Sequence, residues 1–249
     1  MGIQICLRLG RHPSGLVCVI LSGLLIATAM QAAAVTELAD RDPWVAMNRG
    51  LYGFNDRLDT WILRPIANSY DKIMPDPLQR GVSNIFDNFG TPAVAINQFL
   101  QGKVAAGSVD TARFLINSTL GIAGLFDVAN QMGLQQHDED FGQTLAVWGV
   151  AQGPYFMIPF RGSSTITHAG GMLVDAFLNP MRFIRPIRAR NTTYGFYFVD
   201  LRARLLGVEA LISGDEYLFI RDAYLQRRDY LIKDGEIEDD PFLDDEFDE

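Results

Sequence analysis

Ser164 and His168 are the side chains in this sequence that come nearest to a nucleophile and its general base. They lie four residues apart, and such a pair could serve a hydrolase that acts on lipid. The surrounding RGSST at 161–165 is not the G-x-S-x-G elbow that exposes the serine of many hydrolases. A turn followed by a helix cap explains the same residues, because Ser and Thr accept hydrogen bonds from the first turn of a helix. We favour the cap and keep the lipid hydrolase as an alternative.

The run HDED at 137–140 contains residue types that bind metal ions. Its spacing matches no established metal site, since the sequence has no H-E-x-x-H motif and no cysteine beyond residues 1–34. The GIAG at 121–124 is not followed by the Lys-Ser/Thr of a phosphate-binding loop. We therefore predict a solvated loop at 137–140, no metal ion, no cofactor and no catalytic residues. An enzyme is the minority hypothesis.

Residues 141–160 contain no Asp, Glu, Lys or Arg, and twenty uncharged residues are long enough for a helix to cross a bilayer. Gly149 and Gly153 weaken a helix, and Pro154 and Pro159 remove backbone donors, so one straight helix is not expected. The GPY at 153–155 is typical of a turn. We expect an apolar hairpin that enters a membrane or lies in its interface, with a buried core loop as the alternative. The candidate residues for this membrane hairpin or for a lipid channel are Phe141, Trp148, Gly153, Pro154, Tyr155, Phe156, Ile158, Pro159 and Phe160.

The first 34 residues are typical of a cleaved export signal. A pair of arginines precedes an apolar stretch at 16–26, and small residues offer cleavage after Ala29 or Ala34. An uncleaved anchor is the alternative, because residues 16–35 carry no charge. Both cysteines lie in this segment, and Cys18 is a poor lipidation site because apolar sequence continues beyond it. Cleavage would leave a mature chain without a thiol or a disulfide.

The charge of the chain is concentrated at its C-terminal end. Residues 234–249 hold ten acids and no base, so we expect this tail to be disordered. The body at 35–233 has a normal length for one domain and is nearly neutral, with 20 acids and 19 Lys or Arg. A nearly neutral body lacks the basic surface that binds nucleic acid.

Helix signals and apolar periodicity predict an all-α protein built from short helices. Asp42-Pro43 is expected to start the first helix, with the aspartate as its cap. Helices this amphipathic either pack as an α-domain or lie flat in a membrane interface. The predicted helices are 42–63, 65–73, 78–89, 92–100, 104–120, 140–150 and 216–232, with an extended piece at 155–158. Two apolar faces are predicted by periodicity: Val109, Ala112, Ile116 and Leu120, and Phe198, Leu201, Leu205, Val208 and Ile212.

An ordered set of motifs runs through the mature chain. The first reads D-P-W-x3-N-R-x2-Y-x-F-N-x2-L-D and is carried by Asp42, Pro43, Trp44, Asn48, Arg49, Tyr52, Phe54, Asn55, Leu58 and Asp59. FLINSTLGIAGLFDVA follows at 114–129, then FGQTL, GPY and PF-x-G within 141–162, and IRDAYLQRRDYLI at 220–232. This set closely resembles the MlaA/VacJ family, and the resemblance covers residues 41–235.

The resemblance implies a ring of short amphipathic helices lying in the inner leaflet of a Gram-negative outer membrane. In that family a central amphipathic channel lets misplaced phospholipids leave the outer leaflet. The ring associates with a trimeric porin and passes lipid to the soluble periplasmic carrier MlaC, and no catalytic residue belongs to this activity. The hairpin at 141–160 corresponds to a mobile loop beside the channel. Enteric members are lipoproteins, whereas this chain lacks a convincing lipidation box.

A phospholipid channel needs polar and apolar surfaces, because a charged head group is costly in hydrocarbon. Gly149, Gly153 and Gly162 could act as hinges of a gating loop or simply satisfy turn geometry. The expected function is retrograde phospholipid transport, and the non-enzymatic alternative is a soluble periplasmic lipid-binding adaptor. The acidic tail should point into the periplasm, where a basic carrier is a hypothesis for its partner. The candidate head-group contacts are Asn117, Ser163, Ser164 and Thr165.

Overall fold

The computed structural model describes residues 41–207, 212 and 214–235, and it divides the chain into Met1–Pro43 and Trp44–Glu249. The export signal predicted at 1–34 and nearly all of the acidic tail predicted at 234–249 lie outside the described residues. The arrangement of helices is defined within Trp44–Glu249.

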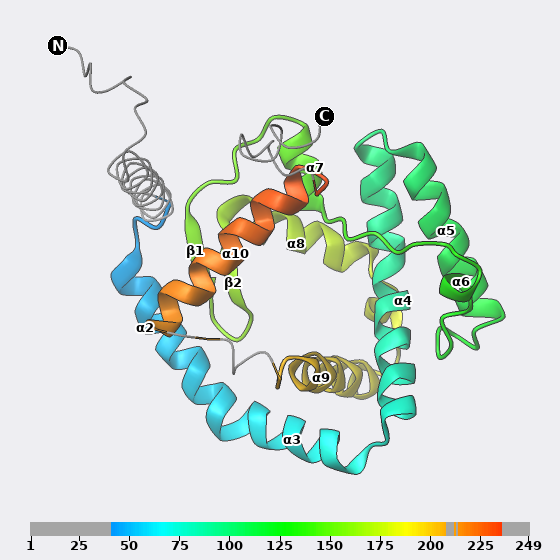
Figure 1. The fold of residues 1–249 in the computed structure, drawn as a ribbon, viewed down its shortest axis with the longest axis horizontal. Coiled ribbons are helices and arrows are strands. Elements are labelled where there is room, and N and C mark those ends of the chain that lie inside the picture. Colours follow the sequence, from blue (N-terminus) through cyan, green and yellow to red (C-terminus); the bar gives the residue numbers. More distant parts are fainter. Residues whose placement is uncertain (1–40, 208–211, 213, 236–249) are drawn as a thin grey trace, which may run out of the picture. The chain divides into compact units, whose positions relative to one another are not determined.

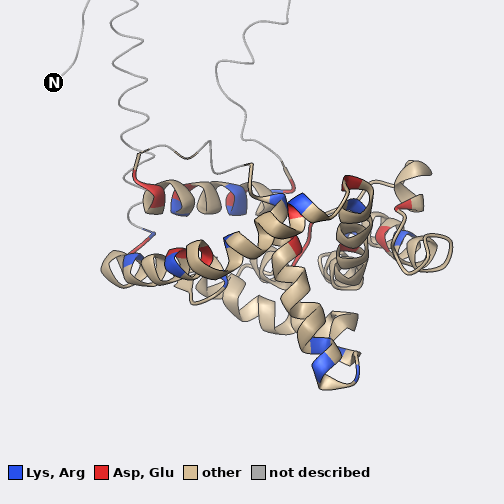
Figure 2. Ribbon diagram, turned by 90° about the horizontal axis from the view of Figure 1, so that it is seen from below, with Lys and Arg blue, Asp and Glu red and all other residues tan. Residues whose placement is uncertain are grey.

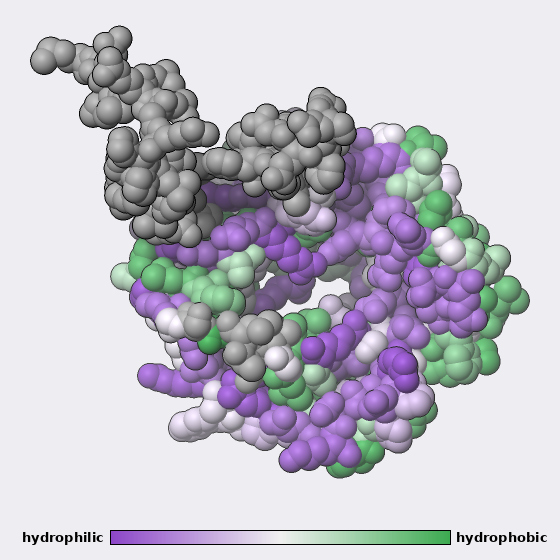
Figure 3. Space-filling model, viewed as in Figure 1, coloured by the Kyte–Doolittle hydropathy of each residue, from purple (hydrophilic) through white to green (hydrophobic). Residues whose placement is uncertain are grey.

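The described part of Trp44–Glu249 is built from helices and one β-hairpin, as the sequence predicts. Its elements in chain order are α2 (Val45–Leu58), the π-helix η1 (Asp59–Leu63), α3 (Arg64–Ile73), α4 (Asp76–Leu100), α5 (Val104–Thr119), α6 (Val128–Gln131), α7 (Phe141–Val147), β1 (Tyr155–Ile158), β2 (Gly162–Thr165), α8 (Ile166–Leu178), the 3-10 helix η2 (Pro180–Phe183), α9 (Ile187–Arg204) and α10 (Glu216–Ile232). In Figure 1 most of these helices surround an open centre, α5 and α6 lie outside α4, and α9 is seen nearly end-on beside the centre. The face shown in Figure 3 is hollowed at the same place.

The chain forms one continuous helical run from α2 through η1 into α3. Pro65 explains the π turn, because its ring would clash with the carbonyl four residues earlier, and the wider turn lets the Arg64 N–H donate to the Asp59 carbonyl instead. The start of this run differs from the prediction. Helix α2 begins at Val45 without a side-chain cap, so Asp42 precedes the helix by too many residues to cap it.

Helix α4 replaces the two helices predicted at 78–89 and 92–100. It continues through Pro92, and the hydroxyl of Thr91 donates to the Asp87 carbonyl on the turn that the proline weakens. Close packing of α4 on α5 along much of its length favours one straight helix over a break. Two other helices follow the prediction closely: α5 ends one residue early, at Thr119, and α10 has the predicted bounds.

Helix α9 ends earlier than the periodicity through 198–212 predicts. Its last helical residue is Arg204, and Val208 lies outside the described residues. The rotation of α9 is fixed by a polar residue rather than by the apolar face. The buried side chain of α9 is Asp200, whose carboxylate accepts hydrogen bonds from Tyr70 and Ser83. Leu201, a member of the predicted face, is exposed.

The described residues are distributed with polar groups inside and apolar groups outside. Seventeen polar or charged side chains are buried against 11 hydrophobic ones, while 32 large hydrophobic side chains are exposed. Water-soluble domains bury most of their large apolar side chains, so this distribution indicates that the outer surface is covered by something other than water. Figure 3 shows hydrophobic residues along the outer edge beside α5. No helix in the described ranges is both long enough and apolar enough to cross a membrane.

Helix α5 illustrates the inverted pattern. The side of α5 that faces other helices carries Gly107, Asp110, Arg113 and Asn117, which recur every three or four residues. The predicted apolar face through Val109 to Leu120 is only half-buried or exposed. Arg113 is compensated inside the protein, since its Nη2 lies 3.1 Å from the Asp127 carboxylate. Such pairing is what makes a buried charge tolerable.

The uncharged segment at 141–160 contains the short helix α7 and the strand β1, so it is not the hairpin predicted for these bounds. The β-hairpin instead spans residues 155–165 and includes Arg161. Strands β1 and β2 are antiparallel, with Tyr155 opposite Thr165 and Ile158 opposite Gly162. The extended piece predicted at 155–158 is therefore confirmed. Gly149, Gly153 and Gly162 all have positive φ, so each satisfies turn geometry that other residues adopt at a cost.

Candidate functional site

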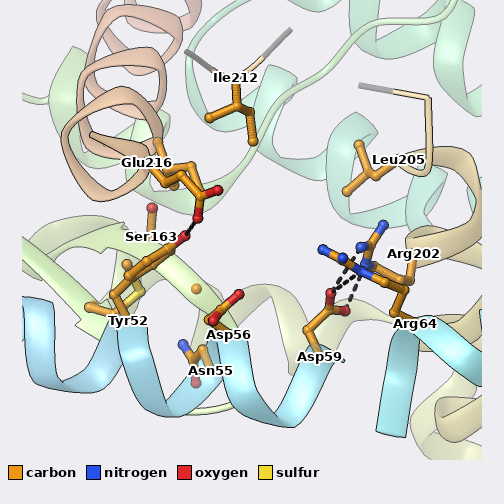
Figure 4. Close-up of a pocket in the computed structure, with 13 residues that line it drawn as sticks. Tyr52, Asn55, Asp56, Asp59, Arg64, Ser163, Arg202, Leu205, Ile212 and Glu216 are labelled. Carbon is orange, nitrogen blue, oxygen red and sulfur yellow. Dashed lines mark hydrogen bonds and ion pairs between the residues drawn. The ribbon is translucent and has the colours of Figure 1, made fainter. Parts of the chain in front are cut away.

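A cavity of about 500 Å³ lies where α2, the hairpin, α9 and α10 approach one another. Figure 4 shows its wall, with Asp59, Arg64 and Arg202 on one side, Tyr52 and Glu216 on the other, and the aliphatic Ile212 and Leu205 above them. Its lining residues are Tyr52, Asn55, Asp56, Asp59, Arg64, Met157, Gly162, Ser163, Arg202, Leu205, Ile212, Glu216 and Ile220. The cavity therefore combines cationic, anionic and apolar surface within a few side chains.

Asp59, Arg64 and Arg202 form the charged end of the cavity. The Nε and Nη2 of Arg202 donate to the two Asp59 oxygens at 2.7 and 2.9 Å, and the Nε of Arg64 lies 3.4 Å from the same carboxylate. Two guanidinium groups thus share one carboxylate at this end of the cavity (Figure 4). Asp56 and Glu216 add two further carboxylates to the lining. Guanidinium groups bind carboxylates and phosphates through the same planar arrangement of N–H donors.

Tyr52 and Glu216 link the N-terminal and C-terminal helices at the opposite side of the cavity. The Tyr52 hydroxyl donates to a Glu216 oxygen at 2.9 Å. Burial, reinforced by this hydrogen bond, raises the pKa of Tyr52 well above its ordinary value, so the hydroxyl stays a donor at physiological pH. Leu205, Ile212 and Ile220 supply the adjoining apolar wall. This part of the cavity suits the hydrocarbon of an amphiphile.

Two asparagines of the first motif hold the hairpin against α2. Asn48 donates to the Tyr155 carbonyl at 3.3 Å and accepts from the Met157 N–H at 3.0 Å. Two helical turns later, Asn55 donates to the Ile158 carbonyl at 2.9 Å and accepts from the Phe160 N–H at 2.8 Å. Each amide therefore satisfies one donor and one acceptor on the open edge of β1. These two contacts position the hairpin beside the cavity.

Other members of the same motif join α2 to the remaining elements. Arg49 forms an ion pair with Asp215 at 2.9 Å, and its guanidinium lies 4.7 Å from the centre of the Tyr217 ring. Phe54 meets Phe160 edge to face, with ring centres 5.2 Å apart. With Asn48, Asn55, Tyr52 and Asp59, these contacts make a polar seam along α2 and η1. The seam closes the helices around the cavity.

The hairpin candidates divide into buried and exposed side chains. Tyr155 is fully buried, and its hydroxyl is 2.8 Å from the Ser163 Oγ. Phe156 and Ile158 are half-buried, whereas Phe160 is 69% exposed at the tip next to the exposed Pro159. Farther along the segment, Phe141, Gly153 and Pro154 belong to α7 and the turn before β1, and Trp148 is exposed while its Nε1 donates to the Leu100 carbonyl.

The four head-group candidates do not lie together. Ser163 lines the cavity. Asn117 is buried elsewhere, where it donates to Asp127 and accepts from the Ala129 N–H. Ser164 and Thr165 have no exposed surface, and Thr165 caps α8 by accepting from the His168 N–H. We therefore retain Ser163 as a candidate contact and assign structural roles to the other three.

In the Ser164–His168 pair the serine is buried and the histidine is half-buried. The Ser164 Oγ is 3.4 Å from the His168 Nδ1, but Ser164 is fully buried and its hydroxyl donates to the Thr165 carbonyl. The same His168 nitrogen lies 2.7 Å from the hydroxyl of Tyr224. Burial lowers the pKa of His168, although nearby Asp140 opposes this effect. A nucleophile with no exposed surface cannot reach a substrate.

The HDED run forms a loop, as predicted, and Asp138 is exposed. The loop is only partly solvated, because Glu139 is buried and the side chains of the run are paired with other elements. His137 contacts Asp110 at 2.7 Å, and Asp138 forms an ion pair with Arg227 at 2.7 Å. The two acids that follow are paired as well, with Lys103–Glu139 at 2.7 Å and Arg228 Nη2–Asp140 at 2.9 Å. The described residues contain no cluster suited to a metal ion.

Arg64, Arg202 and Glu216 are among the cavity residues that sequence reasoning missed, together with Asp56, Met157, Leu205, Ile212 and Ile220. The first motif includes Asp59, but the arginine that pairs with it is 143 positions away. A lone arginine beside an apolar periodicity gives no signal of such pairing. A sequence clue existed only for Asp59, because a carboxylate within a membrane-related apolar helix requires a cationic partner.

These features define a class of protein: a helical ring whose outer surface suits lipid and whose cavity combines paired charges with apolar side chains. The family model described as "MlaA lipoprotein" matches residues 40–231, and the chain belongs to this family. It is 36% identical to the "Intermembrane phospholipid transport system lipoprotein MlaA" of Escherichia coli, over 87% of this chain and 90% of that protein.

Two further comparisons agree. The Haemophilus influenzae protein of the same description is 30% identical, over 88% of this chain and 92% of its own length. A solved structure described as "Structural basis for maintenance of bacterial outer membrane lipid asymmetry" superimposes with a TM-score of 0.69 at 34% identity. It covers 77% of this chain and 98% of the solved chain.

Proposed function

We propose that this protein carries phospholipids between the two membranes of the cell envelope, removing misplaced molecules from the outer leaflet of the outer membrane. The single observation that carries the proposal is the cavity in which Arg64 and Arg202 share Asp59 next to an aliphatic wall. The relatives described as components of an intermembrane phospholipid transport system support it.

The cavity suggests how a phospholipid is held. The phosphate competes with Asp59 for the guanidinium groups of Arg202 and Arg64, because both anions need the same N–H groups. The acyl chains lie along Leu205, Ile212 and Ile220. Ser163 and Tyr52 offer hydroxyl groups to the glycerol and head-group oxygens. No covalent step is required, so catalysis does not belong to this proposal.

The ring is proposed to lie in the inner leaflet of the outer membrane, facing the periplasm. Exposed apolar side chains on the outer rim suit acyl chains, while the backbone groups stay paired within each helix. A trimeric porin is the proposed neighbour in the membrane. The soluble carrier MlaC is the proposed acceptor of lipid on the periplasmic side, which makes the transport retrograde.

The test is the amount of phospholipid on the surface of intact cells, measured by lipid A palmitoylation or by phospholipase accessibility. Deleting the gene should raise surface phospholipid, and the wild-type gene should restore it. Arg202→Gln should restore it poorly, whereas Arg57→Gln, an exposed arginine of α2 away from the cavity, should restore it fully. Unchanged surface phospholipid on deletion would overturn the proposal, and recovery of the protein in the aqueous fraction would favour a soluble adaptor.

A further inference from the structure

The end of the projection formed by α8 and α9 carries four arginines, at Arg182, Arg185, Arg188 and Arg190, which we call the basic tip. Residues 176–199 contain these four bases and no acid. Figure 2 shows the Lys and Arg colour gathered at the lowest point of the molecule in that view, where α8 passes through η2 into α9. The basic tip is therefore a local concentration of positive charge in an otherwise nearly neutral body.

The arginines of the basic tip are arranged differently from most arginines of the ring. Elsewhere in the described chain, Arg49, Arg113, Arg202, Arg204 and Arg228 each form an ion pair with a carboxylate. Within the same described ranges, no carboxylate pairs with Arg185, Arg188 or Arg190. The segment 182–188 with Arg190 borders a groove of about 970 Å³. Unpaired guanidinium groups around one groove are the expected features of an anion-binding surface.

Large apolar side chains surround the basic tip. Phe177, Phe183 and Ile187 are 61%, 73% and 63% exposed. The guanidinium of Arg182 lies over the Phe177 ring, 3.9 Å from its centre. Aromatic and aliphatic groups interleaved with arginine are the composition of segments that lie at the boundary between acyl chains and head groups. A purely electrostatic contact with a soluble anion would leave these apolar side chains in water.

We propose that the basic tip binds the phosphate groups of membrane lipids and fixes the depth of the ring in its leaflet. Phe183 and Ile187 enter the acyl-chain boundary, and the arginines engage phosphates at head-group level. Lipid is favoured over nucleic acid or an acidic protein, because the apolar rim continues along α8 through the exposed Leu173 and Ile166. This site is separate from the transport cavity, since the two share no lining residue.

The experiment measures binding of the full-length protein, diluted from mild detergent, to vesicles of phosphatidylcholine alone or with phosphatidylglycerol added. Arg185→Gln/Arg188→Gln should weaken binding to the anionic vesicles roughly 25-fold at low salt, because each charge near an anionic surface contributes roughly fivefold. Binding to phosphatidylcholine alone should change little. The control Arg57→Gln/Lys72→Gln removes the same charge from exposed positions on α2 and α3 and should leave both affinities unchanged.

Phe183→Ser provides the second arm, and it should weaken binding to both kinds of vesicle. Inorganic phosphate at millimolar concentration should not displace the protein from either kind of vesicle, because phosphate cannot replace the contacts of the apolar side chains with lipid. Equal anionic-vesicle affinity of wild type and Arg185→Gln/Arg188→Gln would overturn the proposal, as would equal loss in the control pair or full competition by inorganic phosphate. Because Arg202→Gln should not alter vesicle binding, failure of the basic tip is distinguishable from failure of the proposed transport.

Discussion

Asp59 and Arg202 form a two-point ion pair at one end of the cavity, at 2.7 and 2.9 Å, although 143 residues separate them in the chain. Their side chains are only 22% and 11% exposed. The pair joins the π turn η1 to α9, so it ties the first helical run to the far wall of the cavity. A phosphate that displaces Asp59 from Arg202 would also loosen this connection, which couples lipid entry to the closure of the ring.

Arg202→Gln should lower the unfolding free energy by about 2 kcal/mol, because it removes charged hydrogen bonds from a largely buried carboxylate. For a chain of this length the melting temperature in detergent should fall by roughly 5 °C. Adding Asp59→Asn should recover part of the loss, since the double variant removes the carboxylate that Arg202→Gln leaves with the longer contact to Arg64. Additive losses in the double variant would show that the two residues do not interact.

Asn55→Ala should loosen the hairpin tip. The substitution removes the hydrogen bonds to the Ile158 carbonyl and from the Phe160 N–H, at a cost of about 2 kcal/mol. Trypsin should then cleave faster after the exposed Arg161, and the rate of this cleavage is the measurement. Gly50→Ala is the matched control on α2, because a Cβ there meets nothing within 4 Å and should leave the cleavage rate unchanged.

Deleting Asn55, rather than truncating it, should have a larger effect. One missing residue rotates the following part of the helix by about 100°, which moves Asp59 away from Arg202. We expect a misgated channel or a misfolded ring, seen as altered surface phospholipid on intact cells. If the deletion behaves like Asn55→Ala in both the trypsin and the surface-lipid measurements, the register of α2 and η1 is not critical.

Gly171→Ala should destabilise the crossing of α7 and α8. A Cβ at this position would lie 2.5 Å from the backbone nitrogen of Gly142, and a backbone atom cannot yield as a flexible side chain does. The expected cost is about 3 kcal/mol. At the neighbouring Gly170 an added methyl group would meet nothing within 4 Å, so Gly170→Ala should be neutral or stabilising by up to about 1 kcal/mol. Thermal unfolding of the two variants side by side decides the matter, and equal stabilities would contradict the close crossing.

Acidification should destabilise the fold through His168. Burial lowers the pKa of His168, an effect that Asp140 opposes and that Arg228 and Arg161 assist. The imidazole of His168 is therefore harder to protonate in the folded state than in the unfolded state. The stabilisation is therefore fully present above the unfolded pKa of about 6.5 and is lost as pH falls through the lowered folded pKa. The melting temperature should drop between pH 7.5 and 5.5. His168→Asn keeps an acceptor toward Tyr224 and should show a smaller drop over the same interval.

Phe160→Asp should weaken membrane association while the fold persists. Phe160 is 69% exposed at the hairpin tip, so an aspartate there would not disturb the protein core. A charge that contacts acyl chains is costly, so the aspartate should weaken binding to the membrane. The measurement is partition between membrane and aqueous fractions, with circular dichroism to confirm folding. Tyr155→Asp is the contrast, because that side chain is fully buried and the variant should fail to fold. Unaltered partition of Phe160→Asp would indicate that the tip does not touch lipid.

Helix positions could be predicted from the sequence where local signals decide them. Asp215 accepts from the Leu218 N–H at the start of α10, and Thr165 accepts from the His168 N–H at the start of α8. These caps involve residues three apart, so they are visible in a short stretch of sequence. The same holds for the turns at Gly149 and Gly153.

The orientation of the helices and the cavity arginines could not be predicted in this way. Apolar periodicity indicates a face but not what covers it, and on α5 the buried face is the polar one with Asp110, Arg113 and Asn117. Head-group candidates chosen by residue type alone included Asn117, whose amide is already satisfied by Asp127 and Ala129. Pairing over long sequence distances, as between Asp59 and Arg202, leaves no local trace.

The seam along α2 is made of polar contacts, among them Arg49–Asp215 and Tyr52–Glu216, and its strength therefore depends on its surroundings. In water such contacts compete with solvent and hold the first and last helices together only weakly. In a leaflet, where the effective dielectric is low and no water can replace a lost partner, the same contacts become costly to break. The contacts between the first and last helices are thus easiest to break in water, and surrounding lipid would strengthen them.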